Sequence, residues 1–254
     1  GKTALIALIV ALGGFLMGFD ASVIAGVVGA IEVEFALSKI QLGWSVSSLS
    51  LTATLGMLLA GPVSDRLGRR PVLMIAAILF ALSAVASAIA PDFLTFILAR
   101  MLGGFGVGAA LIVAPMYIAE MSPPELRGRM VSINQLNIVI GISAAFFSNY
   151  LILTLGESGS VWVEILKMDD WGWRWMLFVE ALPAVVYLLA LLLVPESPRW
   201  LVMQGRDDEA RAVVSRIRGS EQSEALLAQV HESLEAEKAL GEVTYRTLLN
   251  PSLR

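Results

Sequence analysis

Three ionisable residues lie well inside long apolar stretches of the sequence: Asp20, Arg100 and Glu180. A charge that faces hydrocarbon is costly, so such residues usually face a protein interior and mark a functional path. At 1.5 Å per residue, each lies about 10–12 Å from one end of its stretch, which predicts one common depth on three helices. A carboxylate with variable access to water and to an arginine can take up and release a proton. A static buried ion pair is the alternative.

A second set of polar side chains consists of amides in one apolar stretch. Gln135 lies about 9 Å from the start of that stretch at Met130, and Asn134, Asn137 and Asn149 belong to the same stretch. Amides both donate and accept hydrogen bonds, which suits a neutral polyhydroxyl ligand. For each asparagine, a hydrogen bond between helices is the alternative.

A third set of charged residues lies near the ends of apolar stretches, all on one side. Arginine has a planar fork that pairs with a carboxylate through two hydrogen bonds. Such pairs at a half-wet rim form and break at modest energy, which suits a latch; neutralisation of helix ends is the alternative. The acidic members are Asp65, Glu120 and Glu196, and the arginines are Arg66, Arg69, Arg70, Arg127 and Arg199.

Several kinds of chemistry are disfavoured by composition. The sequence has no cysteine and a single histidine, His231, which argues against thiol chemistry, a histidine metal site and a catalytic triad. The glycines within residues 103–108 lack the preceding strand of a nucleotide-binding loop, so close helix packing is the better interpretation. The net charge of −4 carries no basic surplus for nucleic acid. We expect no cofactor, no metal and no enzymatic activity.

The elements that hold these residues are predicted from length and hydropathy. The chain has 254 residues, of which 57% are hydrophobic and only 16% charged, and its mean hydropathy is +0.75. Each of six apolar stretches is long enough to cross a hydrocarbon core of about 30 Å as a helix. The sequence therefore predicts an all-α, polytopic membrane protein. The six stretches are Ala4–Val28, Leu42–Pro62, Val72–Ala90, Phe93–Ala119, Met130–Leu155 and Trp173–Val194.

The character of the chain changes after Pro195. Residues 206–240 are charged and carry apolar residues such as Ala210, Val214 and Ile217 at helical spacing. We expect residues 1–195 to form a six-helix membrane bundle and residues 196–254 to form a cytoplasmic helical segment.

Orientation follows from the lysines and arginines of the short loops. Residues 66–70 and 127–129 supply five arginines on one side, whereas the other side has only Lys39 and Lys167. The arginine side is therefore predicted to be cytoplasmic, together with both termini. Tryptophans on the opposite side are typical of an aromatic belt: Trp44, Trp162, Trp171, Trp173 and Trp175.

Several motifs together resemble the sugar porter family of the major facilitator superfamily. The first resembles the signature loop of the superfamily and includes Gly61, Asp65 and Gly68. The full set comprises residues 61–70, Pro115–Glu120 with Arg127, Pro195–Arg199, Gly18–Asp20, Asn134–Leu136 and Trp173–Trp175.

The resemblance implies half of a major facilitator fold, with three helices repeated twice, and a role for each motif. Asp20 is similar to the proton-binding aspartate of bacterial sugar–proton symporters, Arg100 to its partner, and Glu180 to an acidic residue in the same coupling. Gln135 is similar to a glutamine that contacts sugar, and Asn134 belongs to its motif. The charged rim is similar to a latch of the outward-facing state.

The implied function is proton-coupled monosaccharide transport by alternating access. Facilitative uniporters carry asparagine where Asp20 stands, so Asp20 favours symport. A facilitative uniporter and a non-transporting sugar sensor are the alternatives. Ile142 and Met17 depart from residues found in some symporters, which leaves the sugar open.

Members of this family have two six-helix halves, and this chain resembles the amino-terminal half with its linker. Residues 245–254 resemble the approach to a seventh span. We therefore expect a multi-pass protein of the cytoplasmic membrane whose partners are monosaccharide, protons, lipids and a carboxy-terminal half. A homodimer of such halves is the alternative.

Overall fold

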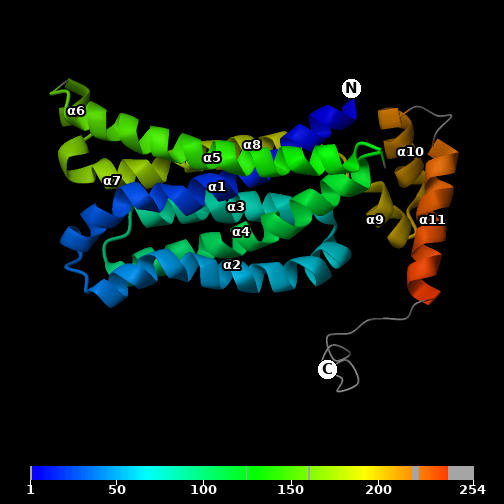
Figure 1. Cartoon of the computed structure of the whole chain (residues 1–254), viewed down its shortest axis with the longest axis horizontal. Coiled ribbons are helices and arrows are strands. Elements are labelled where there is room, and N and C mark those ends of the chain that lie inside the picture. Colours follow the sequence, from blue (N-terminus) through cyan, green and yellow to red (C-terminus); the bar gives the residue numbers. More distant parts are fainter. Residues whose placement is uncertain (1, 124, 160, 219–222, 240–254) are drawn as a thin grey trace, which may run out of the picture. The chain divides into compact units, whose positions relative to one another are not determined.

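The computed structural model describes residues 2–123, 125–159, 161–218 and 223–239, and it contains helices and no strand within these ranges (Figure 1). The chain divides into two compact units, Gly1–Ser197 and Pro198–Arg254. The first unit holds the long apolar helices. They are α1 (Lys2–Glu34), α2 (Lys39–Leu67), α3 (Arg69–Ala88), α4 (Phe93–Met121), α5 (Arg127–Gly156), α6 (Val161–Ile165), α7 (Met168–Val179) and α8 (Ala181–Leu191).

Among the described residues of this unit, six segments are long and apolar enough to cross a membrane, and each overlaps one predicted stretch. The sixth, Asp170–Leu191, combines α7 with α8. The prediction of an all-α protein with six membrane helices is therefore confirmed.

The helices pack in a pattern that repeats. Helix α1 packs against α5, and α4 packs in the same way against α2, while α3 contacts α4 and α8. Glycine permits the closest approach: Gly141 of α5 lies against the backbone of Phe15 in α1, where any side chain would overlap it. Close packing by small residues, as expected for membrane helices, thus holds α1 and α5 together.

The sixth span is assigned as two helices, although its backbone stays helical between them. Helix α7 ends at Val179, α8 begins at Ala181, and Glu180 between them has a φ of −62° and a ψ of −27°. Pro183 lacks an N–H group, so the carbonyl of Val179 loses its usual helical partner. The Glu180 N–H bonds the carbonyl of Leu177, at 3.2 Å. The predicted sixth stretch is therefore one membrane-length segment with a local change of hydrogen bonding at Glu180.

The second unit contains α9 (Pro198–Met203), α10 (Asp207–Arg218) and α11 (Ser223–Ala239). Trp200, Leu201, Ala210 and Leu227 form its small core. The helical spacing predicted within residues 206–240 corresponds to α10 and α11, whereas residues 219–222 and 240–254 lie outside the described part. The membrane location of residues 1–195 and the cytoplasmic location of residues 196–254 stay predictions.

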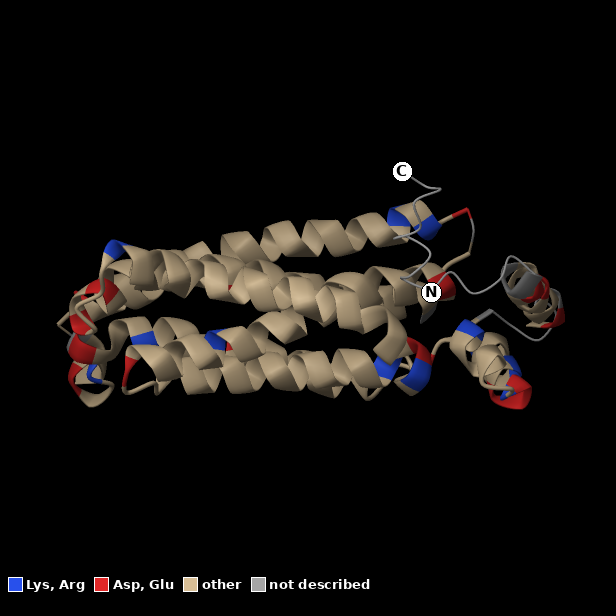
Figure 2. Ribbon diagram, turned by 90° about the horizontal axis from the view of Figure 1, so that it is seen from below, with Lys and Arg blue, Asp and Glu red and all other residues tan. Residues whose placement is uncertain are grey.

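Charges gather at the two ends of the first unit (Figure 2). We call the end with Arg66, Arg69 and Arg70 the arginine end, and the end with α6, Trp44 and Trp171 the tryptophan end. One predicted belt residue is placed differently, because Trp173 is only 5% exposed and packs edge-on against Phe35 and Phe96. Trp173 is therefore a core residue.

Candidate functional site

Asp20 and Arg100 form a fully buried ion pair between α1 and α4. Their exposed fractions are 1% and 2%. Arg100 Nη1 donates to Asp20 Oδ1, and Nη2 donates to the carbonyl oxygen of Asp20 at 3.2 Å. The guanidinium therefore holds both the side chain and the backbone of Asp20.

Glu180 completes a group of three charges. Its side chain is 2% exposed, and its carboxyl group interacts with that of Asp20. Two ionised carboxylates beside one guanidinium leave an uncompensated buried negative charge, which is costly. One proton shared by the two carboxyls makes the group neutral. The three residues predicted to share a depth are thus brought together from three helices.

The group also has unused hydrogen-bonding capacity. Asp20 Oδ2 and Arg100 Nε are buried without a hydrogen-bond partner among the described residues. Buried polar atoms normally have partners, and a proton shared with Glu180 would supply one for the Asp20 carboxyl.

The structure separates the two amides of the predicted sugar-binding motif. Gln135 is exposed on α5, whereas Asn134 is 6% exposed and its Oδ1 lies against Gly14 of α1. Neighbouring helical residues point in different directions, so the Asn134 side chain does not share the face of Gln135. The sequence-based assignment of both residues to one ligand site is therefore not supported for Asn134.

The other two asparagines make the bonds of structural residues. Asn149 Nδ2 donates to the carbonyl of Val23 in α1 at 3.0 Å, and Asn137 Nδ2 donates to the carbonyl of Ile133 in its own helix at 2.9 Å. Both side chains therefore donate to backbone carbonyls within the six-helix unit.

Arg69 is the centre of a network at the arginine end. Its Nε and Nη2 donate to the Glu120 carboxylate at 3.1 and 3.0 Å, which is a two-bond fork. Its Nη1 donates to Asp65 Oδ1 at 3.0 Å and to the carbonyl of Ser64 at 3.1 Å. The side chain is 4% exposed. One arginine thus joins α2, α3 and α4.

Glu196 ties the segment after α8 to the same network. It accepts the N–H groups of Arg69, Arg70 and Ser197 at 3.1, 3.2 and 2.8 Å. Burial raises the pKa of Glu196 above its usual value, although these N–H groups oppose the rise. The hydroxyl of Ser197 donates to Glu120. Sequence reasoning did not single out Ser197, although it belongs to the Pro195–Arg199 motif.

The remaining arginines of the predicted latch differ in their partners. Arg70 donates to the carbonyls of Leu191 and Leu192, both at 3.0 Å, and Arg127 donates to the carbonyl of Ala119 at 3.1 Å. They hold the ends of α8 and α4. Arg66 is exposed, and Arg199 belongs to the second unit.

The two glycines of the signature loop also differ. Gly68 has a φ of 101° and lies against the Glu196 carboxylate, so a side chain there would be strained and would overlap it. Gly61 faces open space. Gly68 is therefore required by the network, and no contact explains Gly61.

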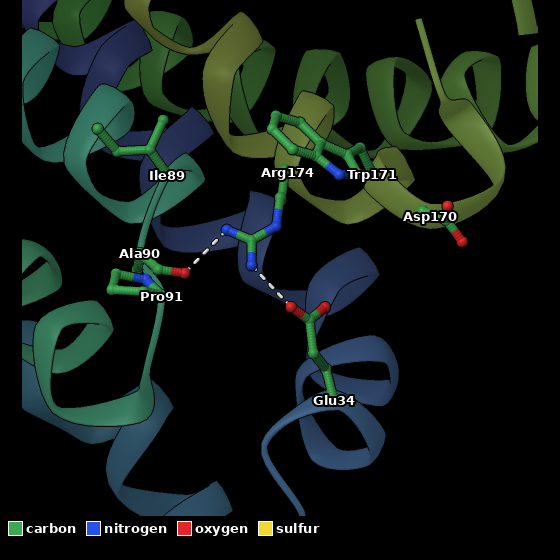
Figure 3. A pocket seen from close by; sticks show the side chains of 7 residues that line it. All are labelled: Glu34, Ile89, Ala90, Pro91, Asp170, Trp171 and Arg174. Carbon is green, nitrogen blue, oxygen red and sulfur yellow. Dashed lines mark hydrogen bonds and ion pairs between the residues drawn. The ribbon is translucent and has the colours of Figure 1, made fainter. Parts of the chain in front are cut away.

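Sequence reasoning missed a second charged cluster, at the tryptophan end. Glu34 accepts from Trp173 Nε1 at 2.6 Å and from Arg174 Nη2 at 2.7 Å, and Arg174 Nη1 donates to the carbonyls of Ala88 and Ala90 at 2.9 and 2.8 Å. Figure 3 shows the pocket of about 440 Å³ beside it. Its lining residues are Glu34, Ile89, Ala90, Pro91, Asp170, Trp171 and Arg174. The Trp-Arg-Trp triplet was the available signal.

Comparison with known proteins gives a consistent picture. The model of the family described as "Sugar (and other) transporter" matches residues 6–252. The chain is 39% identical to the arabinose-proton symporter of Bacillus subtilis, over 100% of this chain and 53% of that protein. It is 36% identical to the D-xylose-proton symporter of Escherichia coli, over 93% and 52% respectively.

Solved structures agree. The proton:xylose symporter XylE bound to 6-bromo-6-deoxy-D-glucose superposes with a TM-score of 0.86 at 34% identity, over 94% of this chain and 54% of XylE. A partially occluded inward-open form of XylE from E. coli gives 0.85, over 94% of this chain and 61% of that structure. The chain thus spans about half the length of the curated relatives it matches.

Proposed function

We propose, from the premise that this chain belongs to the sugar transporter family of the major facilitator superfamily, that it forms the amino-terminal half of a proton-coupled monosaccharide symporter. The observation that carries the proposal is the buried group of Asp20, Arg100 and Glu180. The similarity to arabinose- and xylose-proton symporters supports the substrate class and the coupling ion.

Coupling rests on the charge of the buried group. When Asp20 is ionised, it holds Arg100 through its carboxylate, and α1 stays tied to α4. A proton on Asp20 weakens that tie, so the two helices can move relative to each other around bound sugar. Proton binding thereby changes the equilibrium between access states, which is what symport requires.

Gln135 is the proposed sugar contact of this half. It lies exposed on α5 and offers a donor and an acceptor for hydroxyl groups. The carboxy-terminal half supplies the other wall of the cavity, because transport paths of this kind run between the two repeats. Membrane lipids surround the remaining apolar faces.

The arginine end faces the cytoplasm in this proposal, as the excess of loop arginines indicates. The Arg69–Glu120–Glu196 network then latches the cytoplasmic ends of α2, α3 and α4. The latch holds the outward-facing state until sugar and proton are bound. Localisation in the cytoplasmic membrane with both ends of this segment inside follows from the same orientation.

The test is sugar uptake by the full-length transporter in proteoliposomes with an imposed inward proton gradient. Asp20→Asn keeps the shape of the side chain and removes its titration, so we expect sugar binding and exchange to persist and accumulation to be lost. Asp92→Asn is the matched control, because Asp92 caps α4 outside the spans and asparagine caps a helix equally well.

Accumulation by Asp20→Asn equal to that of the parent would overturn the coupling assignment. Exchange without accumulation in the parent itself would favour a facilitative uniporter.

A further inference from the structure

The sixth span runs antiparallel to α1 and is bonded to it on both sides of Glu180. Helix α1 ends at the tryptophan end, where α7 begins (Figure 1). On that side, the ion pair of Arg174 with Glu34 joins α7 to α1 at 2.7 Å. On the other side, the hydroxyl of Tyr187 in α8 donates to the carbonyl of Val10 in α1 at 3.3 Å. The two bonds therefore bracket the buried charged group.

Tyr187 fits closely against α1. Its side chain is completely buried, and a Cβ added at Gly13 would lie 2.8 Å from its hydroxyl oxygen. A glycine at this position therefore lets the ring approach α1. A buried tyrosine hydroxyl usually finds a hydrogen-bond partner, and here the partner is a main-chain carbonyl three residues before the glycine. The glycine and the hydroxyl together define where α8 meets α1.

The ion pair at α7 does not by itself fix the position of α8. Pro183 leaves the carbonyl of Val179 without its usual helical partner, and the Ala184 N–H bonds the carbonyl of Glu180 at 3.4 Å, which is long for such a bond. Bends in helices occur at sites of this kind. Each half of the sixth span therefore needs its own contact with α1.

Apolar packing between α1 and α8 is incomplete beside the Tyr187 bond. Side chains that line a void lose contacts on that side, so apolar packing restrains α8 less here than a filled interface would. The Tyr187 bond accordingly matters more for the position of α8. The void is a pocket of about 360 Å³ lined by Leu12, Phe15, Phe19, Leu182, Pro183 and Val186.

We propose that Tyr187 is a positioning residue for proton coupling, and that its bond to α1 keeps the Glu180 carboxyl beside that of Asp20. The inference rests on the proposed function and adds a residue that acts on the coupling group from a distance. Tyr187 lies seven residues after Glu180, about 10 Å along the helix axis, so its own side chain takes no part in proton binding.

The position of Glu180 matters because each of two neighbouring carboxylates disfavours ionisation of the other. Arg100 of α4 is the cation beside the pair. Arg174, on the same span as Glu180, is bonded at the tryptophan end, and α3 and α5 carry charged residues only at the arginine end. If α8 shifts, Glu180 moves away from Asp20 and the pair binds its proton less tightly. Uptake should then need a lower external pH.

The experiment measures two quantities in proteoliposomes of the full-length transporter. One is the external pH at which sugar uptake, driven by a fixed membrane potential, is half-maximal, and the other is counterflow of labelled sugar at equal pH. Tyr187→Phe removes the hydroxyl and keeps the ring. We expect the half-maximal pH to fall by roughly 0.5–1 unit, part of the effect of one nearby charge. Counterflow should stay unchanged, because exchange moves no net proton.

A second variant disturbs the same contact from the opposite helix. Gly13→Ala places a methyl group where it displaces the Tyr187 hydroxyl, so it should shift the half-maximal pH in the same direction. The double variant of Gly13→Ala with Tyr187→Phe should shift it no further than the larger single effect, because residues in one contact have non-additive effects.

Two comparisons separate positioning from a general effect on the fold. Tyr117→Phe removes another buried tyrosine hydroxyl, which donates to the carbonyl of Pro195 at 2.6 Å, and it should keep the half-maximal pH of the parent. In the Glu180→Gln background the pair has lost one carboxyl, so Tyr187→Phe should cause no further shift there.

The proposal is overturned if Tyr187→Phe keeps the half-maximal pH of the parent, or if it shifts that pH equally in the presence and absence of Glu180. An equal shift by Tyr117→Phe also overturns it, because loss of any buried hydroxyl would then suffice. If Asp20→Asn abolishes accumulation while Tyr187→Phe behaves as the parent does, the positioning role is wrong and the proposed symport stands. A parent that moves sugar without protons contradicts both.

Discussion

At the scale of residues, Arg100 and Arg69 each pair with a buried carboxylate. Arg100 and Asp20 are 2% and 1% exposed, and Arg69 and Glu120 are 4% and 9% exposed. Removing one partner of such a buried pair leaves an uncompensated charge. Arg69 also binds Asp65, whose side chain is 54% exposed, and an exposed pair exchanges its partner for water at small cost. The bond to Asp65 is therefore the part of the proposed latch that opens most easily.

The separation of Gln135 from Asn134 predicts different effects of two neighbouring substitutions. Gln135→Ala should weaken sugar binding by about 1–3 kcal/mol, since a sugar hydroxyl loses its buried partner. Asn134→Ala should leave affinity unchanged, because its side chain packs on Gly14. Titration calorimetry of the full-length transporter measures both. Equal affinities of Gln135→Ala and the parent would make Gln135 a packing residue.

The raised pKa of Glu196 predicts a pH-dependent stability. Burial raises the pKa of Glu196 in the folded protein above its usual 4.5, so the folded state binds the proton more tightly than the unfolded state. The contribution of Glu196 is therefore fully present below pH 4.5 and is lost as the pH rises through the raised pKa. Glu196→Gln should remove this part of the slope.

Thermal unfolding of the parent and of Glu196→Gln, measured in detergent from pH 4 upward, checks this prediction. The control is Glu209→Gln on α10, whose exposed carboxylate has a lowered pKa beside Arg206 and should not show the same slope. A parallel pH dependence of the parent and Glu196→Gln would contradict the assignment.

At the scale of elements, the network at the arginine end depends on where helices end. The termini of α2, α3, α4 and α8 meet at Arg69, Arg70 and Glu196. Helix ends therefore carry the proposed latch, whereas Asp20, Arg100 and Glu180 lie within membrane-length segments.

The latch predicts unequal effects of two arginine substitutions. Arg69→Ala removes bonds to Glu120 and Asp65, whereas Arg127→Ala removes one bond to a carbonyl. Ser132 lies on the exposed face of Gln135, nearer the arginine end. In an otherwise cysteine-free transporter, Arg69→Ala should raise the thiol reactivity of Ser132→Cys by roughly ten-fold, since bonds to charged groups contribute about 1.5–3 kcal/mol.

The Arg127→Ala background is the matched control and should react as the parent does. Equal reactivity in the Arg69→Ala background would argue against a latch at Arg69.

At the scale of the whole molecule, apolar side chains cover the outside of the six-helix unit. Helix α5 is the least buried of its spans, with 28% of its most apolar stretch buried, and the corresponding share is 33% in both α2 and Asp170–Leu191. Leu55 and Leu59 of α2 and Phe147 and Tyr150 of α5 are among the exposed side chains. A face of this kind needs lipid or another apolar surface to cover it, which agrees with a half that packs against a second half.

The predicted orientation is tested by cysteine labelling of the two ends. Leu67 and Leu126 are 50% and 43% exposed at the arginine end, and Ile40 is 86% exposed at the other. In right-side-out vesicles, an impermeant reagent should label Ile40→Cys and should reach Leu67→Cys and Leu126→Cys only after the membrane is opened. Ser64 and Ser122 are unsuitable positions because both are buried. Labelling of Leu67→Cys from outside would reverse the orientation.

Much of the fold followed from the sequence because the bilayer restricts the choices. Backbone groups in hydrocarbon must bond within their own segment, so long apolar stretches become helices wherever they occur. The same argument places charged residues inside the bundle, which is why Asp20, Arg100 and Glu180 were found from spacing alone. The motifs added the family and named most residues of the Arg69 network.

Only the tertiary structure decided how these residues use their atoms. Spacing along a helix gives depth, but the direction of a side chain depends on the neighbouring helix, which separates Asn134 from Gln135 and buries Trp173. Arg70 and Arg127 bond to carbonyl oxygens, because the last carbonyls of a helix have no partner within it. These carbonyls compete with carboxylates for the arginines, and a count of charges in the sequence does not reveal them. The contact between the Asp20 and Glu180 carboxyls, and the unpaired Arg100 Nε beside them, are found only when three helices are packed together.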